Sequence, residues 1–310
     1  MPLLEVKDLK VYFPIRGGIM GRIVGYVKAV DGISFEVETG ETVGLVGESG
    51  SGKSTTGKAI LGLVPLMGGQ IIFDGEDITK YINKNRSPYR KSVQMIFQDV
   101  YSSLNAKKRV LDIIAEPLRN FEKLTKAEER KRVDELLAIV GLTPDNALKY
   151  PFQFSGGQRQ RIGVARAIAL KPKLIVCDEP VSALDLSVQA QVLNYLKDIQ
   201  EEMNLAYLFI SHDLGVVQHM CSKLMIMHRA RFVETGPSKI IYDEQVPHHI
   251  YTRRLLSAIP DTDPDMRQIN EDRRIKVSKE YEEDHDKYYG PGNTVYDLKE
   301  ISSGHLVALP

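Results

Sequence analysis

The sequence predicts an α/β fold, and three observations indicate it. Helix-compatible segments at 158–170 and 187–203 each precede an apolar run of strand length, at 174–177 and 205–210. A third apolar run, at 42–46, leads into a glycine-rich loop and then a helix-compatible stretch at 57–64. Strands that alternate with helices in this way are typical of a parallel sheet covered by helices.

The composition limits the class of protein. A chain of 310 residues with 43% hydrophobic and 26% charged residues suits one large globular domain or two modest ones. The 41 basic and 41 acidic residues give a net charge of zero, so no basic excess favours nucleic acid as a partner. No apolar run approaches the roughly 18 residues that span a bilayer, and no secretory signal core is present. The two cysteines, Cys177 and Cys221, lie in apolar runs and suit a reduced cytosolic compartment.

The remaining elements follow from local patterns. We expect short strands in the first half, at Leu3–Val6, Leu9–Phe13, Ile33–Val37 and Thr42–Val46, with a mobile hairpin loop around 17–21. In the charged segment Glu128–Val140 the apolar residues fall on one face, which predicts a helix that Gly141 ends. The charge-rich stretch Asp261–Lys287 predicts a loosely packed or extended tail.

A phosphate site is predicted where the strand at 42–46 meets the pattern G-x-x-x-x-G-K-S. The nine residues are Gly47, Glu48, Ser49, Gly50, Ser51, Gly52, Lys53, Ser54 and Thr55. Their glycines let backbone N–H groups turn toward phosphate oxygens, and the next helix adds its positive end. Lys53 would reach the terminal phosphates and Ser54 would ligate Mg²⁺. The alternative is a glycine-rich hairpin turn.

A second part of the site is predicted at the end of the strand at 174–177. Asp178 suits a metal ligand and Glu179 a general base for water, because ligands of open α/β sheets bind at the carboxyl ends of strands. Taken alone, an Asp-Glu pair in this position is equally compatible with a solvated turn.

Four further motifs carry a family resemblance. They are Phe154-Ser155-Gly156-Gly157-Gln158, which opens a helix with a serine cap, Ile96-Phe97-Gln98-Asp99, Ser182-Ala183-Leu184-Asp185 and Ser211-His212-Asp213. With the phosphate loop and the Asp-Glu pair, their order resembles the nucleotide-binding subunits of ABC transporters over about residues 4–260. The resemblance implies a P-loop NTPase core with an antiparallel β subdomain (1–100 and 156–245), a helical signature subdomain (101–155) and a C-terminal extension (246–310).

The resemblance also implies a role for each motif. Phe13, or Tyr12 in a shifted register, would stack on adenine; Gln98 would contact Mg²⁺ and the attacking water; His212 would contact the γ-phosphate. Ser155, Gly156, Gly157 and Gln158 would complete the ATP site of a partner subunit, and Asp185 would order the dimer seam. ATP and Mg²⁺ are therefore the expected substrate and metal.

Three stretches are similar to the oligopeptide and dipeptide import ATPases: 27–35, 95–105 and 247–260. The glycine-bearing insertion before Val27, together with Arg119-Asn120-Phe121, favours the F-type member of a two-ATPase pair. The implied partners are a paralogous D-type ATPase or a second copy, two integral-membrane permease subunits and an extracytoplasmic binding protein, at the cytoplasmic face of a bacterial membrane. Nickel or glutathione as the solute, and a role in DNA repair or translation, are the alternatives.

Two metal sites are not expected. Related chains often carry C-terminal cysteines that hold an iron–sulfur cluster, but residues 261–310 contain none, and thiolates are the ligands that such a cluster needs. The neighbours His248 and His249 would point in different directions on a helix, so they are not expected to share one metal ion.

Overall fold

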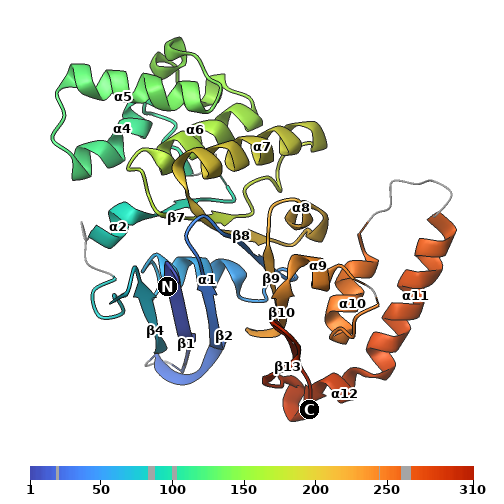
Figure 1. Ribbon diagram of the computed structural model, residues 1–310. Coiled ribbons are helices and arrows are strands. Elements are labelled where there is room, and N and C mark those ends of the chain that lie inside the picture. Colours follow the sequence, from blue (N-terminus) through green and yellow to red (C-terminus); the bar gives the residue numbers. More distant parts are fainter. Residues whose placement is uncertain (19–20, 83–87, 100–102, 244, 260–266) are drawn as a thin grey trace. The chain divides into compact units, whose positions relative to one another are not determined.

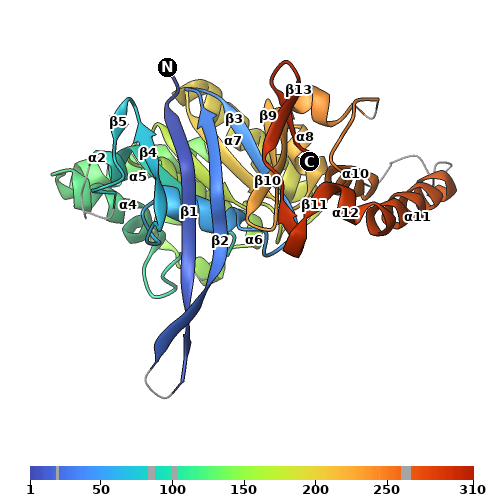
Figure 2. The same cartoon turned by 90° about the horizontal axis from the view of Figure 1, so that it is seen from below.

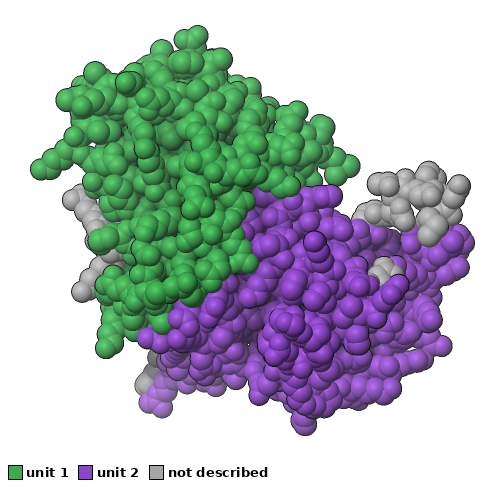
Figure 3. Space-filling view, viewed as in Figure 1, with its two compact units in different colours: residues 1–4, 37–41, 72–208 green, residues 5–36, 42–71, 209–310 purple. Residues whose placement is uncertain are grey.

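The computed structural model describes residues 1–18, 21–82, 88–99, 103–243, 245–259 and 267–310. The chain forms two compact units, which Figure 3 shows in different colours. Unit 1 comprises residues 1–4, 37–41 and 72–208, and unit 2 comprises residues 5–36, 42–71 and 209–310. Both units contain strands and helices, as the predicted α/β class requires.

Unit 2 contains most of the strands and the end of the chain. Its elements are β1 (Leu4–Gly17), β2 (Arg22–Val37), β3 (Thr42–Val46), α1 (Lys53–Ile60), β4 (Gly68–Phe73), α8 (Leu214–Gln218), β9 (Lys223–His228), β10 (Arg231–Pro237), α9 (Ser238–Ile241), α10 (Ile250–Ser257), α11 (Arg267–Glu283), α12 (His285–Tyr288), β11 (Tyr289–Gly290), β12 (Thr294–Val295), β13 (Leu298–Ser302) and β14 (His305–Ala308). In one sheet β9 pairs parallel with β3 and antiparallel with β10, and β10 pairs with β14. All five residues of β3 are buried, which explains why the four from Val43 to Val46 carry no polar side chain.

The N-terminal hairpin differs from its prediction. The sequence predicted two strands, Leu3–Val6 and Leu9–Phe13, but β1 is continuous, and β2 and β4 flank it. Between the predicted strands Asp8 has a φ of 47°, and its N–H donates to Ser34 Oγ at 2.9 Å, so the strand bends there without ending. Figure 2 shows β1 and β2 as a long two-stranded arm. Its predicted mobile tip includes residues 19 and 20, which lie outside the described residues.

Unit 1 combines a parallel strand pair with a group of helices. Its elements are β5 (Glu76–Asp77), α2 (Pro88–Ser92), β6 (Val93–Ile96), α4 (Val110–Phe121), α5 (Lys126–Ile139), two 3₁₀ turns (Pro144–Leu148 and Pro151–Gln153), α6 (Gly156–Ile168), β7 (Leu174–Asp178), α7 (Leu186–Met203) and the start of β8 (Ala206–Ser211). Helices α4 to α7 lie together in Figure 1. The predicted helix at 128–140 is confirmed: a Thr125 capping box begins α5, and Gly141, at a φ of 68°, follows its end.

Of the two alternatives predicted for Asp261–Lys287, a loosely packed or an extended tail, the extended one is wrong from residue 267 onward, because residues 267–283 form α11. This helix lies beside α10 in Figure 1. Arg274 donates to two backbone carbonyls at the end of α10, at 2.9 Å each, and Arg253 of α10 pairs with Glu280 at 2.6 Å. The contacts that hold α11 are largely polar, so apolar periodicity does not reveal it. Residues 261–266 lie outside the described residues.

Among the described helices, none combines the length and the apolar character needed to cross a membrane.

Candidate functional site

The glycine-rich loop in unit 2 has the structure that its sequence predicts. It runs from the end of β3 to α1, whose first residue is Lys53. A Cβ atom on Gly47 would lie 2.1 Å from the Met227 carbonyl oxygen, and one on Gly52 would lie 2.2 Å from the Ala29 carbonyl oxygen. Gly52 also has a φ of 113°, which side-chain-bearing residues rarely adopt. Backbone packing therefore requires glycine at both positions.

Lys53 lies within the curve of this loop. Its side chain is 4% exposed, and Nζ donates to the Gly47 carbonyl at 2.7 Å and to the Glu48 carbonyl at 2.8 Å. The charge thus sits beside the start of α1, where the first backbone N–H groups of a helix have no partner within the helix. An ammonium group next to a helix N-terminus is suited to bind phosphate.

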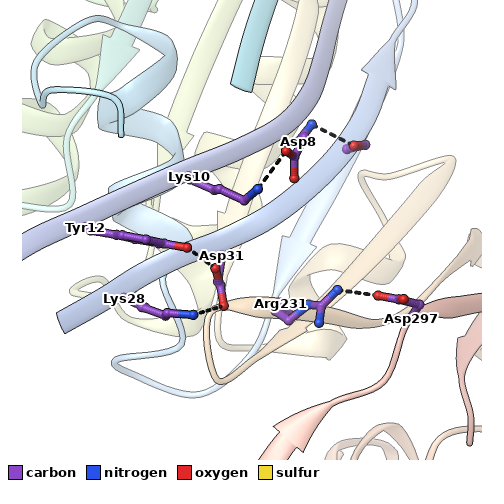
Figure 4. A network of polar contacts seen from close by, with 8 residues as sticks. Asp8, Lys10, Tyr12, Lys28, Asp31, Arg231 and Asp297 are labelled. Carbon is purple, nitrogen blue, oxygen red and sulfur yellow. Dashed lines mark hydrogen bonds and ion pairs between the residues drawn. The ribbon is translucent and has the colours of Figure 1, made fainter. Parts of the chain in front are cut away.

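The two candidate aromatic residues of β1 have different surroundings. Figure 4 shows Tyr12, Lys28 and Asp31 pointing toward one another. The Tyr12 hydroxyl donates to Asp31 Oδ1, which raises the pKa of Tyr12, and Lys28 Nζ lies 5.4 Å from the centre of the Tyr12 ring. Phe13, the next residue, is 39% exposed. Of the two rings, that of Phe13 is the one more open to a stacking partner.

In unit 1 the parallel register of β6 and β7 brings two predicted site residues together. Ile96 pairs with Cys177, so Gln98 and Glu179, each two positions further along, leave the same ends of neighbouring strands. The Gln98 side-chain amide donates to Glu179 Oε2 at 2.8 Å. A hydrogen bond of this kind orients the carboxylate that was predicted to act as a base.

The backbone around the Asp-Glu pair turns sharply. Asp178 is the last residue of β7 and is 4% exposed, whereas Glu179 has a φ of 47°. The left-handed conformation costs about 1–2 kcal/mol for a residue with a side chain. Such strain is common at functional sites.

The predicted serine cap of the signature segment, Phe154–Gln158, is confirmed. Ser155 Oγ accepts the Gln158 N–H at 3.3 Å, and Gln158 Oε1 accepts the Ser155 N–H at 3.1 Å, which forms a capping box at the start of α6. Gly157 lies against α7, because a Cβ atom there would be 2.4 Å from Val188 Cγ1. The glycine therefore permits close packing of α6 on α7, while Gly156 has more room, with Leu184 Cδ2 at 3.5 Å.

Asp185 has a local function that sequence reasoning missed. It is the N-cap of α7, where Oδ1 accepts the Val188 N–H at 3.0 Å and the Ser187 hydroxyl at 2.8 Å. The hydrogen bond from the Val188 N–H and, after it, the one from the Ser187 hydroxyl lower the pKa of Asp185. An aspartate just before an apolar helical segment is a recognisable signal for an N-cap.

His212 follows the last residue of β8 in unit 2 and is exposed. Asp213, the next residue, caps α8 by accepting the Gly215 N–H at 2.8 Å. The predicted site residues thus form two groups. Phe13, the glycine-rich loop and His212 lie in unit 2, while Gln98, the signature segment, Asp178, Glu179 and Asp185 lie in unit 1.

Sequence reasoning also missed a buried cluster in unit 2. Glu234 of β10 is fully buried, and its Oε1 lies 2.6 Å from His248 Nδ1 and 2.7 Å from His305 Nε2. Oε2 accepts the His249 backbone N–H at 2.9 Å. The members are up to 71 residues apart in the sequence, so no local pattern connects them. The sequence signal was only Glu234 itself, a charged residue directly after the apolar pair Phe232-Val233.

Comparisons with known proteins agree with this geometry. A family model described as "ABC transporter" matches residues 30–182. The chain is 56% identical to the oligopeptide transport ATP-binding protein OppF of Lactococcus lactis subsp. lactis (strain IL1403), over 99% of this chain and 96% of that protein. It is 45% identical to the glutathione import ATP-binding protein GsiA of Salmonella paratyphi A, over 100% of this chain but 49% of that protein.

The fold is also similar to a solved structure. The structure of cbiO1 from Clostridium perfringens, described as part of the ABC transporter complex cbiONQ, matches with a TM-score of 0.66 at 27% identity. The match covers 79% of this chain and 92% of that one. Together with 56% identity over almost the full length, this similarity assigns the family: the chain belongs to the ABC transporters, as one of their ATP-binding subunits.

Proposed function

We propose that this chain is the ATP-hydrolysing, energy-coupling subunit of a bacterial importer of oligopeptides or dipeptides. One observation supports this most strongly: the chain matches an oligopeptide transport ATP-binding protein at 56% identity over 96% of that protein's length. The structure adds a glycine loop that encloses Lys53 and a carboxylate, Glu179, held by Gln98. Both features suit cleavage of a nucleoside triphosphate by water.

In this proposal ATP binds through residues of unit 2. The ring of Phe13 stacks on adenine, the loop Gly47–Thr55 surrounds the phosphates, and the Lys53 ammonium reaches the terminal ones. The absence of room for a Cβ atom at Gly47 and Gly52 supports this assignment, because it keeps the loop backbone in a fixed curve. His212 contacts the γ-phosphate.

Oxygen donors suited to Mg²⁺ are present in Ser54, Gln98 and Asp178. A hydroxyl, an amide carbonyl and a carboxylate are ligands that magnesium accepts beside phosphate oxygens, and Asp178 is buried at a strand end. When bound, the ion would neutralise phosphate charge. Glu179 accepts the proton of the attacking water, and the bond from the Gln98 amide keeps its carboxylate oriented.

A second subunit completes each ATP site in this proposal. The signature residues Ser155–Gln158 of one chain face the nucleotide of the other, and Asp185 lies at the seam. The second subunit is a paralogous D-type ATPase or another copy of this chain, at the cytoplasmic face of the membrane. Two permease subunits and an extracytoplasmic binding protein complete the importer.

Two substitutions test the assignment of the nucleotide site. Lys53→Ala removes the charge from the loop, so ATP binding measured by calorimetry should be lost. Glu179→Gln keeps the shape and the contact with Gln98 but removes the base, so ATP should still bind while turnover falls about 10²–10⁴-fold. Wild-type turnover in Glu179→Gln would refute its role as base.

The solute needs a separate experiment, because 45% identity to a glutathione import ATP-binding protein makes glutathione the second candidate. Uptake of labelled tripeptide and of labelled glutathione should be compared in a strain that lacks the chain. Peptide uptake that depends on the wild-type chain, and is not restored by Lys53→Ala, supports the proposal. If the strain loses only glutathione uptake, glutathione and not peptide is the solute.

A further inference from the structure

Helix α10, in the C-terminal part of unit 2, makes two contacts with the glycine loop. The Tyr251 hydroxyl accepts the backbone N–H of Glu48 at 2.8 Å. One turn further along α10, Arg254 Nη2 lies 3.0 Å from Glu48 Oε1. Both contacts join residues more than 200 positions apart, and both reach the same loop residue.

The Tyr251 ring is held firmly behind this contact. It is fully buried and stacks on His228 of β9, with ring centres 4.1 Å apart and planes inclined by 13°. His228 Nδ1 is in turn hydrogen bonded to the Tyr289 hydroxyl at 2.7 Å. The residue before His228 is Met227, whose carbonyl oxygen limits the space at Gly47. The same end of β9 therefore touches the loop directly and supports the tyrosine that binds it.

The backbone of Glu48 is fixed from two sides. Its N–H donates to Tyr251, and its carbonyl accepts from Lys53 Nζ at 2.8 Å. Lys53 is also the residue that the proposed function assigns to the terminal phosphates, so its bonds to the loop compete with that task. The Tyr251 bond occupies only the Glu48 N–H and leaves the other N–H groups of the loop to phosphate, so it can hold the loop whether or not nucleotide is bound.

We propose that Tyr251 is a positioning residue for ATP: by accepting the Glu48 N–H it fixes the curve of the phosphate loop from the C-terminal part of the chain. This inference rests on the proposed role of residues 47–55 as the phosphate loop. Tyr251 contributes more than Arg254, because its ring is fully buried and removal of its hydroxyl leaves the part-buried Glu48 N–H without this acceptor. The Arg254–Glu48 pair has side chains that are 40% and 44% exposed, and such pairs contribute little.

The test is Tyr251→Phe, which removes only the hydroxyl. Its matched control is Tyr207→Phe: Tyr207 is also fully buried, and its hydroxyl donates to the Leu196 carbonyl at 3.0 Å, within unit 1. Each variant loses one hydrogen bond of a fully buried tyrosine, so each should lower the thermal midpoint of unfolding. Arg254→Met is a third variant, which tests the ion pair.

The measurements are the Kd of ATP by calorimetry and the KM and kcat of ATP hydrolysis. Tyr251→Phe should raise Kd and KM about 3–10-fold, the range that one hydrogen bond contributes, and leave kcat unchanged. Tyr207→Phe should leave Kd and KM at the wild-type values, and Arg254→Met should raise them about 2-fold or less. Equal Kd values for Tyr251→Phe and wild type would overturn the proposal, as would an equal rise in the Tyr207→Phe control.

Two further measurements separate the possible failures. If Lys53→Ala binds ATP normally, the proposed phosphate loop is wrong; if Lys53→Ala loses ATP and Tyr251→Phe does not, only the positioning role fails. Should Tyr251→Phe not fold, amide hydrogen exchange of the wild-type protein decides. The Glu48 amide should exchange slowly without nucleotide, and exchange at the rate of an unprotected amide would contradict the proposal.

Discussion

Replacing Glu234 by Gln should destabilise the protein strongly, because it breaks a buried ion pair. His248 Nδ1 faces the Glu234 carboxylate at 2.6 Å, and His248 Nε2 faces the Asp243 carbonyl at 2.8 Å. Both of these groups can only accept hydrogen bonds, so both imidazole nitrogens carry a proton and His248 is a cation. Its partner carboxylate is fully buried and also accepts from His305 and from the His249 backbone.

Removal of one member of a buried pair typically costs about 3–5 kcal/mol of unfolding free energy, because the other charge is left without compensation. In Glu234→Gln an NH₂ group replaces one of the two carboxylate oxygens. Both oxygens accept N–H groups in the wild type, so the NH₂ group must face at least one N–H donor. The free energy of unfolding should therefore fall by about 3–5 kcal/mol in urea titrations at pH 6. A control, Glu283→Gln, changes the same charge on an exposed side chain and should alter it by about 0.5 kcal/mol or less.

The pH dependence separates the ion pair from simple packing. Burial raises the pKa of Glu234, but hydrogen bonds from His248 and His305 outweigh it and lower the pKa below its ordinary 4.5. Burial lowers the pKa of His248, but its bond to Glu234 outweighs this and raises the pKa above 6.5. The contribution of Glu234 is present above pH 4.5 and is lost as the pH falls through its folded pKa. The contribution of His248 is present below pH 6.5 and is lost as the pH rises through its folded pKa.

The ion pair therefore contributes fully between pH 4.5 and 6.5. The stability difference between wild type and Glu234→Gln should be largest in this window and should shrink as the pH rises above it. The buried His228, whose pKa burial lowers to about 3, is present in both proteins, so its titration cancels in the difference. A difference that stays constant from pH 6 to pH 9 would refute the charged state of His248.

Substitutions at three further positions address the glycine-rich loop, the packing of α6 on α7 and the start of α7. Gly47→Ala places a Cβ atom 2.1 Å from the Met227 carbonyl oxygen, so the loop must shift and calorimetry should show weakened ATP binding; unchanged affinity would contradict the fixed curve of the loop. Gly157→Ala, 2.4 Å from Val188 Cγ1, should lower unfolding free energy by about 1–3 kcal/mol in urea, and an unaltered midpoint would show that α6 and α7 adapt. Asp185→Asn retains the N-cap of α7, whereas Asp185→Ala should cost about 0.5–2 kcal/mol; equal stability of the two variants would argue against the cap.

The parts of the fold that depend on local signals could be predicted from the sequence. The strand, loop and first helix around Lys53 are signalled by the apolar run at 42–46 and by the three glycines of the loop that follows, Gly47, Gly50 and Gly52. The serine cap of α6 and the end of α5 at Gly141 are signalled by single residues whose backbone preferences are strong. In each case the residues that determine the structure are neighbours in the chain.

The parts that depend on distant contacts could not be predicted. The kink at Asp8 in β1 is stabilised by Ser34, and α11 is held by polar contacts with α10. The pairing of Gln98 with Glu179 depends on the register of β6 and β7, which are 81 residues apart. Hydrophobic periodicity reports which face of an element is buried, but it does not report which element covers that face.

The buried cluster and the phosphate loop are connected through the start of α10. Glu234 Oε2 accepts the backbone N–H of His249, and His249 Nδ1 accepts the N–H of Tyr251, at 3.1 Å, so the carboxylate helps to place the helix turn that carries the tyrosine. His305, in β14, contacts the same carboxylate. The last strand of the chain is therefore linked by four hydrogen bonds to the N–H of Glu48. Because Tyr251→Phe leaves the first three bonds intact while Glu234→Gln disturbs the first two, comparing ATP affinity in the two variants separates the local contact from its distant support.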